Sequence, residues 1–301
     1  MSSGSFSAVF GVGVGSGVGV GTGAAGVTFG CRRPDCACAA IAHSRITIRQ
    51  VRRWQFMCAN CSTSGENRKS DLLHSGVTMR KLFISRIRDQ APCIRSFDLH
   101  PSERVDFTPG QVALLRAGSE EPAYFAFASA PDDPDLEVLV KQKIGASCVI
   151  YDMKIGDEIE LVDVVGRGFR LDEMKGRDLV FVAMGTGVAP LRSALRHVMK
   201  RKDEFGQFVV LYGARTPDDF CYRHETEAWK DAGVELRQVI SRPDGHDWSG
   251  PTGYVQSLLD HVLPNLASPV ALICGSREMI AQTRERLLKM GFKPDEILTN
   301  Y

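Results

Sequence analysis

A regular alternation of apolar strands and helical segments after about Gly176 constrains the fold more than any other feature. Strands that are apolar on both faces and separated by helices form parallel sheets that helices cover on both sides. The pattern predicts strands at 178–184, 208–214, 234–240, 269–275 and near Ile297, and helices at 189–201, 222–232, 252–263 and 277–291. We therefore predict an α/β doubly wound parallel sheet over residues 175–301, with ligands at the carboxyl ends of its strands.

Residues 78–174 have a different texture, with short apolar or alternating runs separated by Pro and Gly. Closely spaced short strands with such turn residues are typical of an antiparallel β-barrel or sandwich. The predicted strands are 78–89, 94–101, 110–117, 123–131, 136–143 and 157–166. The chain of 301 residues thus has two folded domains, which its length allows.

Residues 1–70 form a third region with the composition of an organelle leader. Residues 1–30 are almost entirely Gly, Ser, Val, Ala, Thr and Phe, and residues 1–65 carry six arginines, no lysine and one acid, Asp35. Glycine at this density disfavours packed structure, and Ser-rich, Arg-bearing, acid-poor segments are typical of transit peptides. We expect a disordered transit peptide, to the chloroplast or alternatively the mitochondrion; a disordered cytosolic tail is the other interpretation.

Charge and cysteine usage exclude several function classes. The chain has 37 basic and 36 acidic side chains, so the part after residue 65 carries a small excess of acids, which argues against a nucleic-acid partner. Cys58 and Cys61 have CxxC spacing but no convincing second ligand pair, and the histidines show no metal-binding spacing, so we expect no metal site. No run of about 18 apolar residues predicts a membrane span.

A glycine-rich turn, Gly185-Thr186-Gly187, stands between the first predicted strand of the α/β region and its helix. Glycine allows a tight turn and close approach of a phosphate, and backbone N–H groups at a helix start attract the negative charge. Pro190 suits the first helical turn because it lacks an N–H that would otherwise have no partner. The turn indicates a site for the diphosphate of a nucleotide, although glycines also occur in many strand-to-helix turns for structural reasons.

Four motifs occur in an order that resembles the ferredoxin–NADP reductase superfamily. Residues 107–111 (FTPGQ) resemble its barrel turn, and 145–161 (GASCVIYDMKIGDEIEL) resemble the segment that starts its flavin pyrophosphate site and closes the barrel. Residues 185–190 (GTGVAP) resemble its phosphate loop, and 274–279 (CGSREM) resemble its CG-P-x-x-M motif, with Ser276 where proline is usual. Each motif alone is a weak signal, and the resemblance rests on their order and spacing over about 220 residues.

The family's flavin signature, Arg-x-Tyr-Ser, is altered in this chain. Its best match places Ala123 at the arginine, Phe125 at the tyrosine and Ala126 at the serine. The guanidinium that would contact flavin phosphate and the hydroxyl near the reactive ring nitrogen are therefore missing. A ring that can stack on the isoalloxazine remains in Phe125, or in Tyr124 if the register slips. The pattern resembles a divergent branch that includes plant and bacterial reductase-like proteins and electron-transfer subunits of hydrogenases or sulfite reductases.

The resemblance implies a site for FAD and a site for NADP or NAD. The residues that it assigns to flavin are Phe125, Ala126, Phe127, Ser129, Gly145, Ala146 and Ser147. The residues that it assigns to the nicotinamide nucleotide are Gly185, Thr186, Gly187, Pro190, Arg215, Ser241, Arg242, Tyr254, Cys274, Gly275 and Met279. Cys274, beside the nicotinamide, and Tyr301, on the flavin ring, are the catalytic candidates.

Three of these assignments have plain structural alternatives. Arg215 and Arg242 either clamp a 2′-phosphate, which would select NADP(H), or are solvated side chains at strand ends. Cys274 is equally compatible with a buried core thiol. Tyr301 either covers the flavin ring or belongs to a frayed terminus.

The function expected from these features is a flavin-dependent oxidoreductase that passes reducing equivalents between NAD(P)H and an electron acceptor through FAD. The acceptor is a separate protein or a small molecule, because no iron–sulfur cysteine cluster is apparent. The loss of the Arg-Tyr-Ser signature leaves an alternative, a catalytically quiet nucleotide sensor or interaction subunit that keeps only the reductase scaffold.

Overall fold

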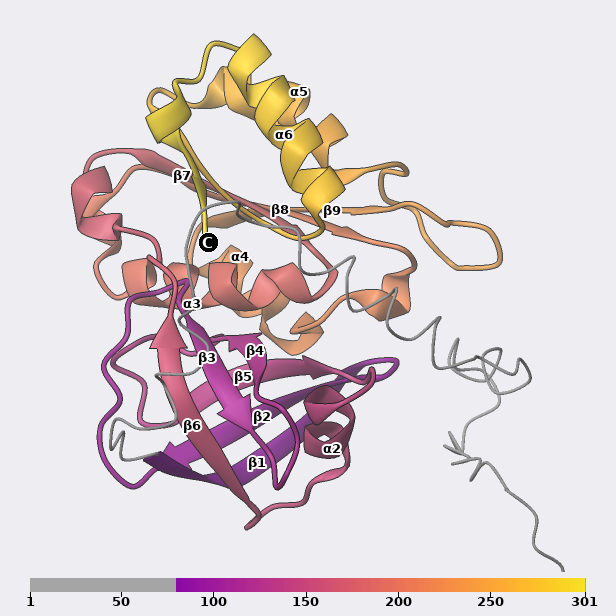
Figure 1. Ribbon diagram of the computed structural model, residues 1–301. Coiled ribbons are helices and arrows are strands. Elements are labelled where there is room, and N and C mark those ends of the chain that lie inside the picture. The colour runs from indigo at the N-terminus through magenta and orange to yellow at the C-terminus, as the bar shows by residue number, and fades with distance from the viewer. Residues whose placement is uncertain (1–79, 301) are drawn as a thin grey trace, which may run out of the picture. The chain divides into compact units, whose positions relative to one another are not determined.

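The computed structural model describes residues 80–300, so the predicted leader at 1–70 and the candidate Tyr301 lie outside the described residues. Six antiparallel strands form the first sheet, in the order β4-β3-β6-β1-β2-β5 (Figure 1). Their bounds are β1 Arg80–Ala91, β2 Ile94–Pro101, β3 Val112–Arg116, β4 Ala123–Ala126, β5 Leu136–Lys141 and β6 Glu158–Val165. All six predicted strands of this region are present.

The two edge strands of this sheet meet just beyond β4. Phe127 forms an isolated antiparallel bridge with Val138, and the N–H of Ala128 donates to the carbonyl of Glu137 at 2.7 Å. This contact closes the sheet, so the region is barrel-like, which decides between the two architectures that the sequence left open. Between β5 and β6 the chain forms one short helix, α2 Ala146–Asp152.

Alternation along the strands fills the barrel. On β1, Leu82 and Ile84 are buried whereas Lys81 and Phe83 are exposed, as the period of two requires. The largest buried rings of the barrel are Phe97 and Phe127, which belong to one core cluster with Leu99 and Leu115. The barrel core is thus built from the side chains on one face of each strand, and the side chains on the opposite face point away from this core.

Five parallel strands form the second sheet, in the order β11-β10-β7-β8-β9 (Figure 1). The strands are β7 Asp178–Met184, β8 Phe208–Ala214, β9 Val234–Ile240, β10 Pro269–Cys274 and β11 Ile297–Thr299, and the helices are α3 Val188–Met199, α4 Thr226–Asp231, α5 Leu259–Val262 and α6 Arg277–Lys289. Short 3₁₀ turns are η2 Leu171–Met174, η4 Lys202–Glu204, η5 Pro217–Asp219, η8 Leu263–Asn265 and η9 Pro294–Glu296.

Two hydrophobic clusters cover the two faces of this sheet. Leu191 of α3 and Trp229 of α4 belong to one cluster, and Leu259 of α5 and Leu287 of α6 belong to the other. Every residue of β8 is buried as a result. The predicted doubly wound sheet is confirmed, and the apolar runs that predicted it are the strands sandwiched between the helix layers.

Two predicted helices are shorter than the periodicity indicated. The helix expected at 252–263 consists of η7 Val255–Leu258 and the single turn α5, because Thr252 instead pairs with Ile240 and prolongs the edge of the sheet. The helix expected at 222–232 starts as η6 Arg223–Glu225 before α4, because Tyr222 adopts a left-handed backbone with φ 59°. Apolar spacing alone does not distinguish such turns from a continuous helix. In the described part of the chain, no helix has both the length and the apolar character of a membrane span.

Candidate nucleotide and flavin site

The strand order of the parallel sheet reverses between β7 and β10. From β7 the chain first proceeds to β8 and β9 on one side and then to β10 and β11 on the other. Ligands of open α/β sheets bind in the crevice beyond the carboxyl ends of the strands at such a reversal. β7 is followed by Gly185–Gly187, which is the 3₁₀ turn η3, and β10 ends at Cys274 and is followed by Gly275, so two predicted motifs lie at this point.

These two turns touch through their backbones. A Cβ atom at Gly187 would lie 2.3 Å from the carbonyl oxygen of Cys274 and 2.8 Å from the nitrogen of Gly275. Gly187 has an ordinary helical φ of −63°, so the close approach, and not the conformation, demands glycine. The structure therefore brings together the two predicted nucleotide motifs, and each shapes the other.

The other residues of the CGSREM motif pack against the backbone at Gly275. A Cβ at Gly275 would lie 2.3 Å from Cε of Met279 and 3.0 Å from Cβ of Met184. Met279 is buried in the core, so its side chain packs beneath the turn and does not line an open surface. Ser276 begins α6 as its N-cap, since its hydroxyl accepts the N–H of Met279 at 3.2 Å.

The first residues of the glycine turn are pinned by a side chain that the sequence analysis missed. The hydroxyl of Tyr212, on β8, donates to the carbonyl of Gly185 at 3.1 Å. Gly185 has φ +55°, and a Cβ there would meet nothing within 4 Å. Thr186 is partly exposed, and Pro190 is buried in the first turn of α3. Nothing local marks Tyr212, which looks like one more apolar residue of a buried strand.

The ends of β8 and β9 place the predicted adenosine-side residues next to each other. The N–H of Arg242 donates to the carbonyl of Arg215 at 2.8 Å, and the N–H of Ser241 donates to the carbonyl of Ala214 at 3.0 Å. Both arginine side chains are exposed, and Tyr254, just before η7, is 69% exposed. The two guanidinium groups thus occupy neighbouring strand ends and are accessible to a ligand.

The strand that contains the predicted flavin residues turns Phe125 and Phe127 into the barrel core and not toward a ligand. Phe125 lies opposite Ala113 of β3 and faces the barrel core, and Phe127 is fully buried and stacks on Phe107 with ring centroids 4.1 Å apart. Tyr124, on the other face, is 70% exposed. Because alternate residues of a strand point to opposite faces, burying Phe125 exposes its neighbour. Tyr124 is therefore the ring of β4 that can meet a ligand, whereas Phe125 and Phe127 offer only their backbone.

Comparison with known proteins places the chain in a family. Residues 181–285 match the model of the oxidoreductase NAD-binding domain. The chain is similar to ferredoxin–NADP reductase B of Sorangium cellulosum, with 32% identity over 213 residues that span 66% of this chain and 87% of that protein. This protein belongs to the ferredoxin–NADP reductase family. The membership makes it an oxidoreductase, as the motifs indicated.

Other comparisons extend the resemblance. This member of the ferredoxin–NADP reductase family is 28% identical to the sulfhydrogenase 1 subunit gamma of Pyrococcus furiosus over 230 residues. The matched residues cover 75% of each chain. Its fold resembles that of a ferredoxin NADP⁺ reductase from Neisseria gonorrhoeae crystallised with FAD and NADP, with a TM-score of 0.63 and 23% identity over 74% of this chain and 97% of that one. The two-domain architecture predicted from the sequence is confirmed.

The family implies a flavin, and the barrel of this reductase-family member has residues that fit one. Beyond the Phe127–Val138 bridge, β4 and β5 form no further pair among the described residues, so β4 keeps an open edge beside Tyr124 and the half-buried Ala126. Asn300, whose carbonyl lies near Gly166 of the barrel, is buried with its side-chain oxygen unpartnered in the described chain. Such an acceptor suits an N–H group of a bound ring.

The segment predicted to hold the flavin diphosphate begins the short helix α2. Gly145 has φ +68°, Ala146 is buried, and the hydroxyl of Ser147 donates to the carbonyl of Ile144 at 3.2 Å. Glu120 lies across from Gly145, with a carboxylate oxygen 3.9 Å from the position of a Cβ there. The hydroxyl of Ser129 is already used, since it accepts the N–H of Glu137 at 2.9 Å in the core. Ser129 therefore shapes the barrel closure and is not open to a ligand.

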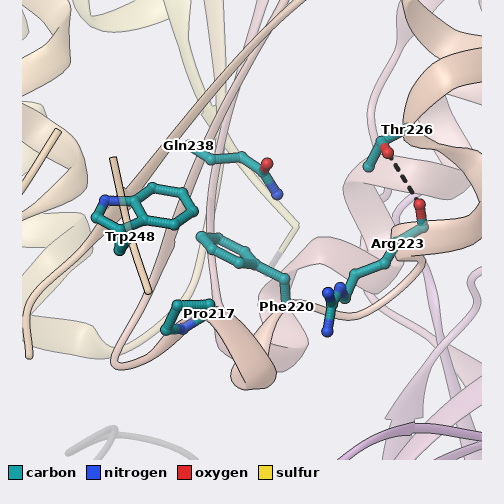
Figure 2. Close-up of a pocket in the computed structure, with 6 residues that line it drawn as sticks. All are labelled: Pro217, Phe220, Arg223, Thr226, Gln238 and Trp248. Atoms are coloured by element: carbon teal, nitrogen blue, oxygen red, sulfur yellow. Dashed lines mark hydrogen bonds between the residues drawn. The ribbon is translucent and has the colours of Figure 1, made fainter. Parts of the chain in front are cut away.

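A pocket that the sequence analysis did not anticipate lies beside the ends of β8 and β9. Its volume is about 280 Å³, and Figure 2 shows the ring of Trp248 and the side chain of Pro217 near the buried ring of Phe220. Polar groups of Gln238, Arg223 and Thr226 complete its lining. The residues come from β9, from the loop after it and from the stretch that runs from η5 to the start of α4, so no contiguous motif marks them.

The thiol of Cys274 is held in its neutral form. Burial raises the pKa of this thiol from 9.0 to about 12, so at neutral pH it is protonated and offers no thiolate nucleophile. In the unfolded chain the thiol ionises near its ordinary pKa, whereas in the folded chain it does so only near 12. The stabilising contribution is therefore complete below pH 9.0 and is lost as pH rises toward 12.

We expect Cys274→Ala to flatten the alkaline fall in the free energy of unfolding. Urea titrations of the variant and the wild type below and above pH 9.0 measure this slope. Cys221 offers a second test of how burial affects thiol ionisation, because burial raises the pKa of its thiol to about 11. An alkaline slope that is identical in wild type and Cys274→Ala would contradict the assignment.

Proposed function

We propose that this protein is a flavin-dependent oxidoreductase that passes reducing equivalents between NAD(P)H and an electron acceptor through FAD. The observation that carries the proposal is the backbone contact between Gly187 and Cys274 at the reversal of strand order, because it builds a diphosphate turn against the motif expected beside the nicotinamide. The family supports it, since the relatives include reductases named for ferredoxin, for a propane monooxygenase and for cytochrome b5.

The chain's own residues supply binding and orientation. The turn Gly185–Gly187 and the start of α3 offer N–H groups and a helix terminus to the diphosphate. Cys274 contributes a neutral thiol at the end of β10, which suits packing against an uncharged ring and not acid–base chemistry. A bound FAD would supply the hydride acceptor for the nicotinamide and one- or two-electron release to the electron acceptor. Tyr124 and the open edge of β4 are the residues that would hold its ring.

The pocket beside β8 and β9 is proposed for the adenosine half of the nucleotide. It adjoins the strand ends that carry Arg215 and Arg242, and an aromatic wall beside polar groups suits a purine with its ribose. The neighbouring guanidinium groups favour NADP(H), because a 2′-phosphate would receive charge-assisted hydrogen bonds from them.

Replacing Arg242 by alanine is expected to raise the KM for NADPH roughly tenfold to a hundredfold, because a hydrogen bond to a charged group contributes about 1.5–3 kcal/mol. The KM for NADH should stay within about threefold, since NADH has no 2′-phosphate. Arg237→Ala is the matched control, because Arg237 is exposed on β9, the strand that precedes Arg242, and pairs with Glu235. Equal losses with both nucleotides would show that Arg242 does not read the 2′-phosphate.

An absorption spectrum of the purified full chain tests the proposal directly. We expect flavin bands that bleach when NADPH or NADH is added without oxygen, and reduction of an artificial electron acceptor. A colourless protein that also fails to bind added FAD would contradict it. The replacement of the family's arginine and serine by Ala123 and Ala126 favours the second candidate, a nucleotide sensor without electron transfer, which would bind nucleotide and reduce no dye.

The composition of residues 1–65 supports import into the chloroplast, with the mitochondrion as the alternative. A fluorescent protein fused after residue 70 reports the destination in plant cells. Fluorescence that stays in the cytosol would contradict a transit peptide.

A further inference from the structure

The segment Phe220–Glu225, here called the linking segment, contacts Tyr212, which holds the nucleotide turn, and also contacts the barrel. It follows η5 and leads into α4. At its centre Tyr222 is fully buried with φ 59°, a left-handed conformation that a bulky residue rarely adopts. Such backbone costs of order 1–3 kcal/mol and persists where surrounding contacts over-determine it, often at functional sites. The contacts on either side of Tyr222 show what holds it.

On one side the linking segment supports the glycine turn. The N–H of Cys221 donates to the hydroxyl oxygen of Tyr212 at 3.1 Å, and this hydroxyl donates in turn to the carbonyl of Gly185 at 3.1 Å. The ring of Phe220 packs edge-on against the ring of Tyr212, with centroids 5.0 Å apart. The orientation of the Tyr212 side chain is therefore set by the linking segment through both its ring and its hydroxyl.

The hydrogen bond that fixes the carbonyl of Gly185 also orients the N–H of Thr186, which belongs to the same peptide group. A trans peptide is planar, with its C=O and N–H pointing in opposite directions. Fixing the carbonyl of Gly185 toward the buried Tyr212 hydroxyl therefore directs the N–H of Thr186 the other way, away from Tyr212. The same carbonyl accepts the N–H of Val188 at the start of α3. Tyr212 thus fixes a donor of the turn without touching the ligand itself.

On its other side the linking segment is tied to the barrel. The N–H of Tyr222 donates to the side-chain oxygen of Gln90, on β1, at 2.8 Å. The amide nitrogen of Gln90 donates to the hydroxyl of the buried Ser96, on β2, at 3.0 Å, which fixes the orientation of the Gln90 amide. A chain of hydrogen bonds therefore runs from the barrel hairpin through consecutive residues of the linking segment to the glycine turn.

We propose that the linking segment couples the barrel to the nucleotide turn, with Tyr212 and Gln90 as positioning residues at its two ends. The inference rests on the proposed function for the identity of the ligand, a nicotinamide nucleotide, but the coupling is a property of the protein alone. Its consequence is that a change on the barrel at Gln90 alters nucleotide affinity, although Gln90 lies outside the nucleotide-binding sheet.

Two tyrosines provide a matched pair of variants. Tyr212→Phe removes a hydroxyl with two hydrogen bonds, whereas Tyr222→Phe removes one that has no partner in the described chain, and both side chains are fully buried. We expect Tyr212→Phe to raise the Kd for NADPH about tenfold, consistent with a loss of roughly 1.4 kcal/mol, with kcat nearly unchanged. Tyr222→Phe should leave the Kd at its wild-type value.

The barrel end is tested with Gln90→Leu, which removes the acceptor for the N–H of Tyr222. We expect the Kd for NADPH to rise about threefold, a smaller effect because the perturbation reaches the turn through several bonds. Gln90→Glu keeps an acceptor oxygen at this position and should restore the wild-type Kd. Calorimetric titration of the full chain measures these values without requiring electron transfer.

Hydrogen–deuterium exchange of the full chain without nucleotide separates this inference from the proposed function. Exchange at Val188, whose N–H bonds to the Gly185 carbonyl, should accelerate in Tyr212→Phe and in Gln90→Leu but not in Tyr222→Phe. If the wild type binds no nucleotide or reduces no acceptor, the proposed function fails while this exchange pattern still decides the coupling. Wild-type exchange at Val188 in Gln90→Leu, or equal effects of the two Tyr→Phe variants, would overturn it.

Discussion

Replacing Arg192 by methionine is expected to destabilise the folded protein by about 3–5 kcal/mol, because it removes the cation from the half-buried carboxylate of Glu225 and one of the two cations that face the buried carboxylate of Glu137. Arg192, on α3, is 4% exposed and donates to Glu137 at 2.9 Å and to Glu225 at 2.9 Å. It also donates to the carbonyl of Ala128 at 2.7 Å, and its guanidinium lies 4.3 Å from the ring centre of Tyr222. The contacts with Glu137 and Ala128 join the helix that follows the glycine turn to the closure of the barrel, and those with Glu225 and Tyr222 join it to the linking segment.

The charges in this cluster stabilise one another. Burial by itself lowers the pKa of Arg192, but Glu225 and Glu137 raise it above its ordinary value. Burial raises the pKa of Glu225, but the hydrogen bond and charge of Arg192 lower it below 4.5. Because the folded pKa of Glu225 is depressed, its stabilising contribution is complete above pH 4.5 and is lost as pH falls below that value.

Urea unfolding of Arg192→Met at neutral pH measures the loss. Arg196→Met is the control from the same helix, because Arg196 is partly exposed and its partner Asp133 keeps an ion pair with Lys200. That variant should cost at most about 1 kcal/mol. Adding Glu225→Met to Arg192→Met should recover part of the lost stability, since it removes a carboxylate that has lost its ion-pair partner. Equal stabilities of the two methionine variants would contradict the role of the cluster.

Gly187→Ala is expected to cost about 2–3 kcal/mol of stability and to weaken nucleotide binding at least about tenfold. The new methyl would lie 2.3 Å from the carbonyl oxygen and 2.6 Å from the carbonyl carbon of Cys274. Backbone atoms in the centre of a sheet cannot yield as a flexible side chain does, so the turn itself must move. The displaced turn would no longer present its N–H groups to the diphosphate in the same arrangement.

Gly185→Ala is the control for Gly187→Ala within the same turn. A Cβ at Gly185 meets nothing within 4 Å, but its φ of +55° is strained for alanine. This variant should cost only about 1–2 kcal/mol, the price of a left-handed L-residue. Unfolding free energies and the Kd for NADPH, measured for both variants, separate steric contact from backbone strain. A smaller stability loss for Gly187→Ala than for Gly185→Ala would show that the two turns are not packed as described.

Much of the scaffold could be predicted because its signals are local. Each apolar run and each helical spacing depends on neighbours along the chain, so the strands at 178–184 and 208–214 were predicted within the bounds that the structure shows. The glycine turn was recognisable because strand, glycine and helix are contiguous. Where the local signal was ambiguous, the prediction was wrong in detail, as at Tyr222, which starts no helix because its backbone is left-handed with φ 59°.

The site was predicted less completely because its residues meet only in the fold. The motifs 185–190 and 274–279 were found separately, but their contact follows from the parallel pairing of β7 with β10. Period-two alternation placed Phe125 and Phe127 on one face and Tyr124 on the other, without saying which face is inside. The pairing of Phe125 with the buried Ala113 decided that question in favour of Tyr124 as the exposed ring.

The sequence by itself determined the two-domain plan, the doubly wound order of strands and helices, and the position of the nucleotide turn, because all of these depend on residues close together in the chain. Only the tertiary structure decided which side chains hold that turn. Tyr212 bonds to Gly185 of the turn itself, and Gln90 bonds to Tyr222 of the linking segment, so both act through hydrogen bonds to residues distant in sequence. Such bonds need no local pattern, so their donors and acceptors become recognisable only when the folded chain brings them together.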